Sequence, residues 1–521
     1  MKKLLSLALL AVVGCGTNYK AADKKMTKNL DPIPYGETIT EAELKTHLYT
    51  YASDEFEGRN TGDPGQKKAV AYLRDEYKNL NIPAAKKDGN YFHNVPLQKG
   101  SNLKSELTIN GKDYPFEDQF LTYASNPKGV KNIFEIEYIG YGIDDEKYSD
   151  YKGKNLEGKV VMIKLGEPTN ADGTYIISGT EEATKWSAYL RQEMSAKINA
   201  ARENKVKGVF FYVEDDYTRI KSQFQYVKNS SRMKLRTPDT NEFFYYFVNT
   251  DLAKAINSTI LNDATAKTIA VNAKLTIADE IEEINSENVA AIIKGDEKPE
   301  EYIIISAHLD HEGIKNGKVY NGADDDGSGT VAILEIAEAF KKAKAEGNGP
   351  KRSIVFLHVT GEEKGLLGSR YYTDHDPIFP LENTVTNLNI DMIGRIDPKR
   401  TKGDRNYVYL IGSDKLSTEL HEISEAANKK YTNIELDYTF NDKNDKNRYY
   451  YRSDHYNFAK NNIPVIFYFN GTHDDYHKPT DTPDKINYDL LTNRARLVFY
   501  TAWELANREN KVIVDKATET K

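Results

Sequence analysis

The chain has 521 residues and a formal net charge of -8, so it lacks the basic excess that a nucleic-acid-binding protein usually carries. Charged residues make up 29% of the chain and hydrophobic residues 39%, a balance that fits a soluble globular body with room for two or three domains. Cys15 is the only cysteine, which excludes a disulfide bond within the chain.

The N-terminal segment is separable from the rest of the chain. Two lysines, an apolar run from Leu4 to Val13 and a small residue before Cys15 form the parts of an export signal over residues 1–15. Val-Val-Gly-Cys also resembles a bacterial lipobox, which implies a lipid on Cys15 and an exported protein in the periplasm or on the outer membrane. The alternative is a plain signal peptide. Residues 16–30 are rich in Lys, Asn and Thr and are predicted to be a tether.

The segment 31–104 is expected to be the N-terminal part of the main domain and to be largely helical. Thr38 and Glu41 have the spacing of a capping box, which predicts a helix that ends near Ala52. Apolar residues from Ala69 to Tyr77 recur at helical spacing, which predicts a second helix with one face packed on a sheet.

Residues 105–280 have a different pattern. Short strand-like runs such as Val160–Leu165 alternate with Gly turns, and no histidine occurs between His93 and His308. We therefore expect a smaller β-rich domain, without chemistry of its own, inserted into the main domain. The acidic and polar stretch 278–288 is predicted to be the linker at its end.

From residue 281 to 510, strand and helix patterns alternate, which predicts an α/β domain with a mostly parallel mixed sheet sandwiched by helices. A short tail, 511–521, follows. Strands are expected at Val289–Ile293, Tyr302–Ala307, Ser353–Thr360, Leu388–Met392, Tyr407–Ile411 and Pro464–Phe469. Helices are expected at Thr330–Lys344, Leu366–Thr373, Lys415–Lys430, Asp454–Lys460 and Tyr488–Asn507.

Polar residues collect where these strands end. His308 and Asp310 follow the strand at 302–307, and a loop then supplies three successive aspartates, Asp324 to Asp326. Ligand sites in open α/β sheets lie at the carboxyl ends of the strands. So many negative charges are costly there unless a cation neutralises them. The sequence therefore predicts a metal site at this edge.

The other candidate ligands lie at or just past the ends of later strands. The full set is His308, Asp325, Glu363, Asp391 and His477. Five ligands are too many for one catalytic ion with an open position, and they suit two ions that share a bridging carboxylate. Imidazole and carboxylate ligands without an available thiol favour zinc over manganese or cobalt.

Six motifs in order resemble the dizinc aminopeptidase family, which is family twenty-eight of the metallopeptidases. They are HLD at 308–310, GADDDGSG at 322–329, GEE at 361–363, NIDMIG at 389–394, SDH at 453–455 and YHKPTDT at 476–482. The resemblance covers residues 41–507 apart from the insertion, which looks like a protease-associated domain. It implies a zinc exopeptidase-like fold and an enzyme that removes N-terminal residues from peptide substrates.

The same resemblance implies a role for each site residue. It implies two Zn²⁺ ions with a hydroxide between them, one ion on His308 and Asp391, the other on Glu363 and His477, and Asp325 as the bridge. It further implies that Asp310 orients the imidazole of His308, that Glu362 is the general base, and that Tyr476 faces the developing oxyanion. The peptide bond between Asp325 and Asp326 is expected to be cis.

Alternatives remain at this stage. Carboxypeptidases and glutaminyl cyclases share this site architecture, and a non-catalytic binding protein on the same fold is a further alternative. The run Asp324 to Asp326 alone is typical of an exposed acidic turn. The pair Glu362 and Glu363 alone is typical of the first turn of a helix. Three histidines match no ligand position and are predicted to be structural or rim residues: His311, His358 and His473. Ser453 or Asp454 is expected to cap a helix.

Overall fold

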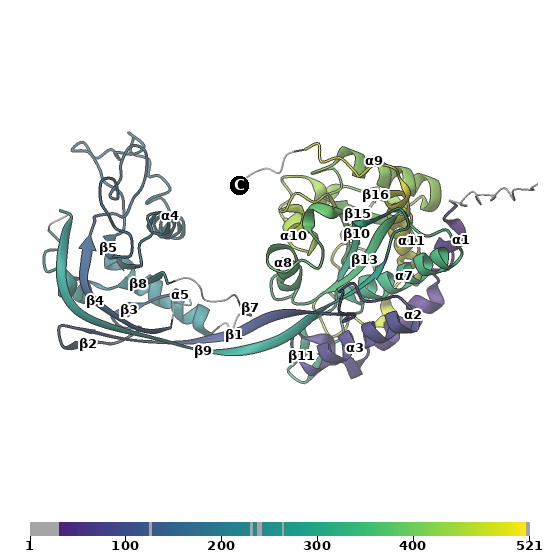
Figure 1. Ribbon diagram of the computed structural model, residues 1–521, viewed down its shortest axis with the longest axis horizontal. Coiled ribbons are helices and arrows are strands. Elements are labelled where there is room, and N and C mark those ends of the chain that lie inside the picture. Colours follow the sequence, from purple (N-terminus) through teal and green to yellow (C-terminus); the bar gives the residue numbers. More distant parts are fainter. Residues whose placement is uncertain (1–30, 124–127, 230–232, 237–241, 263–264, 517–521) are drawn as a thin grey trace, which may run out of the picture.

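The computed structural model describes residues 31–123, 128–229, 233–236, 242–262 and 265–516. The predicted export signal, Cys15 and the predicted tether therefore lie outside the described residues, as does the end of the tail. Every helix in the described part is too short or too polar to cross a bilayer. Figure 1 shows two lobes joined by a long ribbon of two strands. We call them the main lobe, which contains both chain ends of the described part, and the inserted lobe.

The main lobe is built on a mixed sheet, as predicted. Its strands in spatial order are β16 (Glu435–Asp437), β15 (Tyr407–Ile411), β17 (Val465–Phe469), β14 (Thr384–Ile390), β10 (Lys298–His308), β13 (Arg352–Val359) and the end of β9 (Lys267–Ile293). The four central strands, β17, β14, β10 and β13, are parallel to one another. β15 and β9 flank them in the antiparallel direction. A small hairpin of β11 (Gly313–Lys315) and β12 (Lys318–Tyr320) lies outside this sheet.

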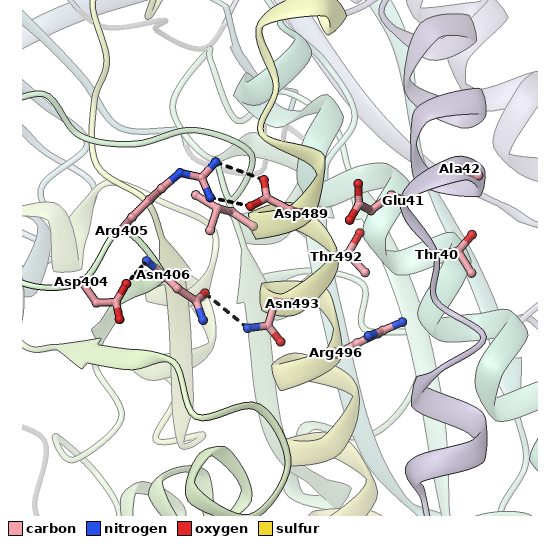
Figure 2. Close-up of a pocket in the computed structure, with 11 residues that line it drawn as sticks. Thr40, Glu41, Ala42, Asp404, Arg405, Asn406, Asp489, Thr492, Asn493 and Arg496 are labelled. Carbon is pink, nitrogen blue, oxygen red and sulfur yellow. Dashed lines mark hydrogen bonds and ion pairs between the residues drawn. The ribbon is translucent and has the colours of Figure 1, made fainter.

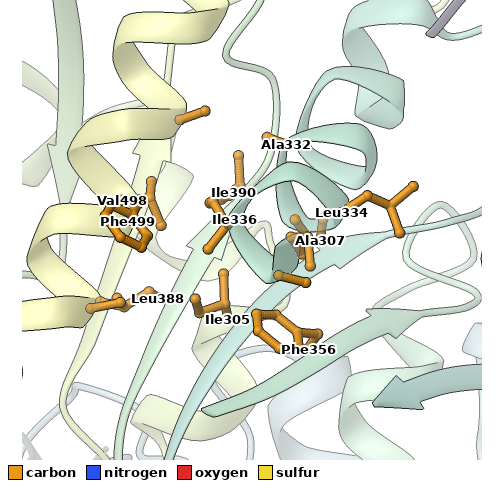
Figure 3. Close-up of a cluster of buried hydrophobic side chains, with 14 of the residues drawn as sticks. Ile305, Ala307, Ala332, Leu334, Ile336, Phe356, Leu388, Ile390, Val498 and Phe499 are labelled. Atoms are coloured by element: carbon orange, nitrogen blue, oxygen red, sulfur yellow. The ribbon is translucent and has the colours of Figure 1, made fainter. Parts of the chain in front are cut away.

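Helices cover both faces of the sheet (Figure 1). They are α1 (Ile33–Gly36), α2 (Glu41–Tyr51), α3 (Pro64–Asn79), α7 (Gly329–Ala345), α8 (Leu367–Asp374), α9 (Thr418–Ala427), α10 (His455–Ala459) and α11 (Tyr488–Asn507). Side chains alternate between the two faces of a strand. Ile305 of β10 and Phe356 of β13 therefore pack against α7 and α11 in one core (Figure 3). Their neighbours Ile304 and Val355 pack against α8 and α10 in another.

The predicted helix near the N-terminus forms, but its cap is two residues later than predicted. α2 begins after Thr40, whose hydroxyl accepts a hydrogen bond from the backbone N–H of Glu43 at 3.3 Å. Thr40 and Glu43 also have capping-box spacing, so the motif exists twice in this stretch. The second copy forms the cap, and Ile39 just before it is fully buried.

The inserted lobe continues the sheet away from the main lobe. It contains β1 (Phe92–Ile109), β2 (Lys112–Tyr114), β3 (Phe120–Leu121), β4 (Gly129–Tyr138), β5 (Val160–Lys164), β6 (Gly208–Tyr212), β7 (Lys234–Leu235), β8 (Phe244–Val248), α4 (Leu190–Glu203), α5 (Tyr217–Asn229) and α6 (Thr250–Ile256). Two separate hydrophobic cores lie on the two faces of its strands. The assignment of this lobe as a protease-associated domain stays a prediction.

The stretch 278–288 lies between the two lobes, where its polarity predicts a linker, but it has the structure of a strand. It lies within β9, which pairs antiparallel with β1 over almost its whole length, from Phe92 with Val289 to Ile109 with Ala273. Charged residues such as Glu282 and Glu283 are exposed here, since this part of the ribbon lies between the two lobes and is open to solvent. Polar composition therefore marks an exposed strand in this case.

Candidate metal centre

The predicted ligands converge at the carboxyl ends of the parallel strands. β10 ends at His308, β14 is followed at once by Asp391, and the turn after β13 carries Glu363. Asp325 comes from the segment before α7, and His477 from the loop after β17. Parallel neighbouring strands end at one edge, so residues far apart in the sequence meet there. The structure brings all five together.

Asp325 lies between two groups of ligands. Its Oδ1 is 3.1 Å from Nε2 of His308, and the same nitrogen is 3.7 Å from Oδ1 of Asp391. Its Oδ2 is 3.0 Å from Nε2 of His477, which is also 3.2 Å from Oε2 of Glu363. One carboxylate oxygen thus faces each group, which is the arrangement a bridging ligand needs.

His311, which the sequence predicts to be a structural or rim residue, lies inside this cluster. Its Nδ1 is 2.9 Å from Oε1 of Glu363 and 3.7 Å from Oδ2 of Asp325, and its side chain is fully buried. The signal in the sequence was its position three residues after His308, in the same loop. That spacing does not by itself say which way the ring points.

The flanking aspartates of the acidic run are buried and organise the loops around Asp325. Both carboxylate oxygens of Asp326 accept backbone N–H groups, from His308 at 3.1 Å and from Gly329 and Met392 at 3.0 and 3.1 Å. Asp324 accepts the N–H of Gly394 at 2.6 Å. The run is therefore not an exposed turn. The peptide bond between Asp325 and Asp326 is cis, as predicted.

Asp310 contacts His308 differently from the prediction. The ring Nδ1 of His308 lies 2.9 Å from the main-chain carbonyl of Asp310, not against its carboxylate. The carboxylate instead accepts the hydroxyl of Thr61 at 2.7 Å and the backbone N–H of Glu362 at 3.1 Å. Its carboxylate therefore faces Thr61 and the turn that carries Glu362, and not the ring of His308. Asp310 thus fixes the position of Glu362.

Two supporting residues were not predicted for these roles. Ser453 donates its hydroxyl to Oδ2 of Asp391 at 2.6 Å. Asp481 accepts the backbone N–H groups of Asp324 and Asp325 at 3.0 and 3.2 Å. Of the two residues predicted to cap α10, Asp454 occupies the N-cap position, but its carboxylate accepts a hydrogen bond from Ser369 of α8 and not from the backbone of α10.

The cluster opens into a small hollow. Glu362 and Tyr476 line it together with Asp325 and Asp391. Arg452 also lines the hollow. Much of the remaining wall is aromatic or apolar and consists of Met392, Tyr449, Phe467 and Phe469. The ring of Tyr476 stacks on His477 with centroids 3.9 Å apart, so the phenol is held beside the ligand cluster.

The other candidate residues lie outside the cluster. His358 contacts the hydroxyl of Tyr77 at 2.7 Å, and His473 lies 3.2 Å from Asp324 behind the bridging residue. A larger hollow of about 730 Å³ lies between α2, α11 and the loop 404–406, where Arg405 pairs with Asp489 (Figure 2). None of the predicted site residues lines it, so it is separate from the cluster.

The electrostatics of the cluster favour a cation. Burial lowers the pKa of His477, but contacts with Asp325 and Glu363 outweigh burial and raise this pKa to about 10. Burial and Asp325 raise the pKa of Glu363, but the neighbouring imidazoles outweigh them and lower it to about 2. Burial raises the pKa of Glu362 well above its usual value, which His308 partly offsets. The negative field that holds protons on imidazole also attracts a divalent ion.

The donor atoms fit a metal rather than a hydrogen-bond network. Four buried atoms of the cluster have no hydrogen-bond partner, although each lies close to another polar atom: Nε2 of His308, Nδ1 of His311, Oδ2 of Asp325 and Oε1 of Glu363. Such orphaned groups are rare in a protein interior unless an ion completes them. The triads His308–Asp325–Asp391 and His311–Asp325–Glu363 each bring three ligand atoms within 4.8 Å of one another.

The protein thus has an α/β fold with a candidate metal centre of imidazoles and carboxylates at the ends of its strands. Residues 288–502 match the profile of Peptidase family M28.

Named relatives match parts of the chain. Aminopeptidase NAALADL1 of Rattus norvegicus is 35% identical over 120 residues, which cover 23% of this chain and 15% of the relative. Aminopeptidase YwaD of Bacillus subtilis is 28% identical over 233 residues, which cover 43% of this chain and 46% of the relative. The matched regions thus span less than half of either relative. A solved zinc aminopeptidase from Bacillus subtilis aligns over 90% of this chain and 96% of its own, with 18% identity and a TM-score of 0.45.

Proposed function

We propose that the protein is a zinc-dependent exopeptidase that hydrolyses N-terminal residues from peptides. The observation that carries the proposal is the convergence of four imidazole and carboxylate side chains around Asp325, with buried ligand atoms that lack hydrogen-bond partners. The names of the partly matched relatives, which are aminopeptidases, support the same activity.

Two Zn²⁺ ions fit the two groups of ligands. His308 and Asp391 would hold one ion, Glu363 and His477 the other, and Asp325 would contribute one oxygen to each. Bound there, the ions would polarise the scissile carbonyl and lower the pKa of a coordinated water.

Glu362 is the general base in this proposal. Its carboxylate lines the hollow beside Asp325 and Asp391, and its backbone N–H is held by Asp310. It takes the proton of the attacking water and passes it to the leaving amine. The phenol of Tyr476, in the same wall, donates to the oxygen that gains charge as water adds to the carbonyl.

The acidic wall supports recognition of a free N-terminus. Glu362 and Asp391 line the hollow, and carboxylates attract the ammonium group of a peptide. The inserted lobe is attached beside this hollow. At its entry into the main lobe, β9 is bonded to the turn after β13, through Ser286 with Thr360 at 2.6 Å and Asn288 with the N–H of Thr360 at 2.9 Å. We propose that the inserted lobe limits the length of the peptides that reach the site.

Glu362→Gln tests the proposed function. The variant keeps the shape of the side chain but cannot accept the proton of water, so we expect it to retain both zinc ions and to lose at least about 100-fold in kcat on aminoacyl anilides. The matched control is Glu335→Gln, which makes the same change at a buried carboxylate of α7. Activity of Glu362→Gln near that of the control would overturn the assignment of the base. Chelation should abolish activity in the wild type and added zinc should restore it.

A carboxypeptidase is the second candidate, because Arg452 lines the same hollow and a guanidinium attracts the carboxylate at the other end of a peptide. A panel of peptides blocked at one end or the other separates the two activities. Hydrolysis only of peptides with a free N-terminus supports the aminopeptidase. Cyclisation of N-terminal glutamine would instead identify a glutaminyl cyclase. Zinc binding without turnover of any substrate would identify a binding protein.

A further inference from the structure

We infer that His311 is a fourth protein ligand at the metal position of Glu363 and His477. This inference rests on the proposed function, since it assigns one more residue to a metal centre of that enzyme. His311 is fully buried, and its Nδ1 lies 2.9 Å from Glu363 and 3.7 Å from Asp325. His477 contacts the same two carboxylates at 3.0 and 3.2 Å, so two imidazoles share Asp325 and Glu363 as neighbours.

The alternative is that His311 only donates a hydrogen bond to Glu363. The geometry argues against it. Although the two atoms are 2.9 Å apart, neither Nδ1 of His311 nor Oε1 of Glu363 makes a hydrogen bond of acceptable geometry. Nε2 of His308, a predicted ligand, stands in the same relation to Asp325 at 3.1 Å. Each imidazole nitrogen thus lies close to two carboxylates without a regular hydrogen bond to either, as a metal ligand does.

The spacing of each imidazole from the two carboxylates also matches that of ligands on one ion. Ligand atoms that lie about 2.0–2.1 Å from a tetrahedral zinc ion are about 3.3 Å from one another. The separations of His311 from Glu363 and Asp325, and of His477 from the same two residues, fall between 2.9 and 3.7 Å. The two imidazole rings have centroids 5.7 Å apart at an interplanar angle of 78°, so they approach the point from different directions.

The surrounding chain holds the His311 ring in this orientation. A Cβ atom at Gly322 would lie 2.5 Å from Cγ of His311, so only glycine leaves room for the ring. The backbone N–H of His311 donates to the carbonyl of Arg59 at 3.3 Å. Arg59 in turn donates to the carbonyl of Gly322 at 2.9 Å, which fixes both sides of the ring's pocket. A preset ligand loses little freedom when it binds.

The consequence is a difference between the two metal positions. One would have a single imidazole, that of His308, with Asp391 and Asp325. The other would have two imidazoles, from His311 and His477, in addition to carboxylates. The second position is then the tighter one and fills first. The first, with three protein ligands, keeps the open coordination that substrate and water need.

Metal titration of the metal-free protein tests the inference without any assay of activity. Zn²⁺ is titrated against a chromophoric chelator, and Co²⁺ by its visible absorption, in the wild type, His311→Ala and His311→Asn. We expect two sites in the wild type. In both variants the first equivalent should bind about 10–100-fold more weakly, with a changed Co²⁺ spectrum. His358→Gln, at a buried histidine that contacts Tyr77, is the control and should match the wild type.

Two results would overturn the inference. One is unchanged affinity and spectrum for the first equivalent in His311→Ala. The other is recovery of wild-type affinity in His311→Asn, whose amide can donate a hydrogen bond to Glu363 but is a poor zinc ligand. Circular dichroism of each metal-free variant establishes whether it is folded. If His311→Ala is not folded, the metal affinity of His311→Asn tests the inference. A wild type that binds no metal would instead overturn the proposed function itself.

Discussion

Ser453 is the last member of a buried chain of hydrogen bonds that ends on Asp391. Asn387 donates to Ser306 at 2.8 Å, Ser306 to Asn389 at 2.7 Å, Asn389 to Ser453 at 2.9 Å, and Ser453 to Asp391 at 2.6 Å. In Ser453→Ala, Asp391 loses a donor and the amide of Asn389 loses its acceptor. A hydrogen bond to a charged group contributes about 1.5–3 kcal/mol, and an orphaned buried donor costs about 1–3 kcal/mol. Since the two effects share one hydroxyl, we expect a loss of about 3 kcal/mol.

Urea denaturation of the metal-free protein measures this loss as a change in the free energy of unfolding. Thr492→Val is the control, because it removes a buried hydroxyl that has no hydrogen-bond partner and should cost under about 0.5 kcal/mol. Zinc titration of Ser453→Ala should also show weaker binding at the position of His308 and Asp391, by about 10–100-fold. If Ser453→Ala proves as stable as the control, the hydrogen-bonded chain does not hold Asp391.

Two further predictions concern buried groups outside the cluster. Burial, with Glu43 and Glu338, raises the pKa of Glu335 to about 8, so the folded protein holds a proton that the unfolded chain releases near pH 4.5. The contribution of this group to stability is full below about pH 4.5 and is lost as the pH rises to about 8. Glu335→Gln should therefore be more stable than the wild type at pH 8 by about 3 kcal/mol and similar to it at pH 4.5. An equal difference between the melting curves of the two proteins at both pH values would contradict this sign. Arg59, which is buried, donates to four main-chain carbonyls, so Arg59→Met should cost about 4 kcal/mol in thermal denaturation, and a cost under 1 kcal/mol would show that those carbonyls find other donors.

Long, strongly patterned elements of the main lobe could be predicted from the sequence. The strand Tyr407–Ile411 and the helix Tyr488–Asn507 have the predicted bounds. Elements whose pattern depends on tertiary surroundings could not. The three-residue strand Glu435–Asp437 has no apolar alternation of its own and exists because it pairs with β15. The strand conformation of the stretch 278–288 could not be predicted, because nothing in its composition shows that β1 will pair with it.

For the candidate site, residue types and strand ends were enough to predict which ligands meet. They were not enough to predict which atoms touch. The interaction of His308 with the carbonyl of Asp310, rather than its carboxylate, depends on the path of the backbone after β10. The inward orientation of His311 depends on the absence of a side chain at Gly322. Such details follow from packing between segments, which a single sequence does not show.

The ribbon of β1 and β9 has a consequence for how the protein folds. It pairs residues from opposite ends of the insertion, so its hydrogen bonds have very high contact order and cannot form until the intervening chain is compact. During synthesis, β1 leaves the ribosome long before its partner. The other end of β9 pairs with β13, so this side of the main sheet is completed in the same event. We therefore expect the inserted lobe to collapse first and the metal-binding edge to be completed last.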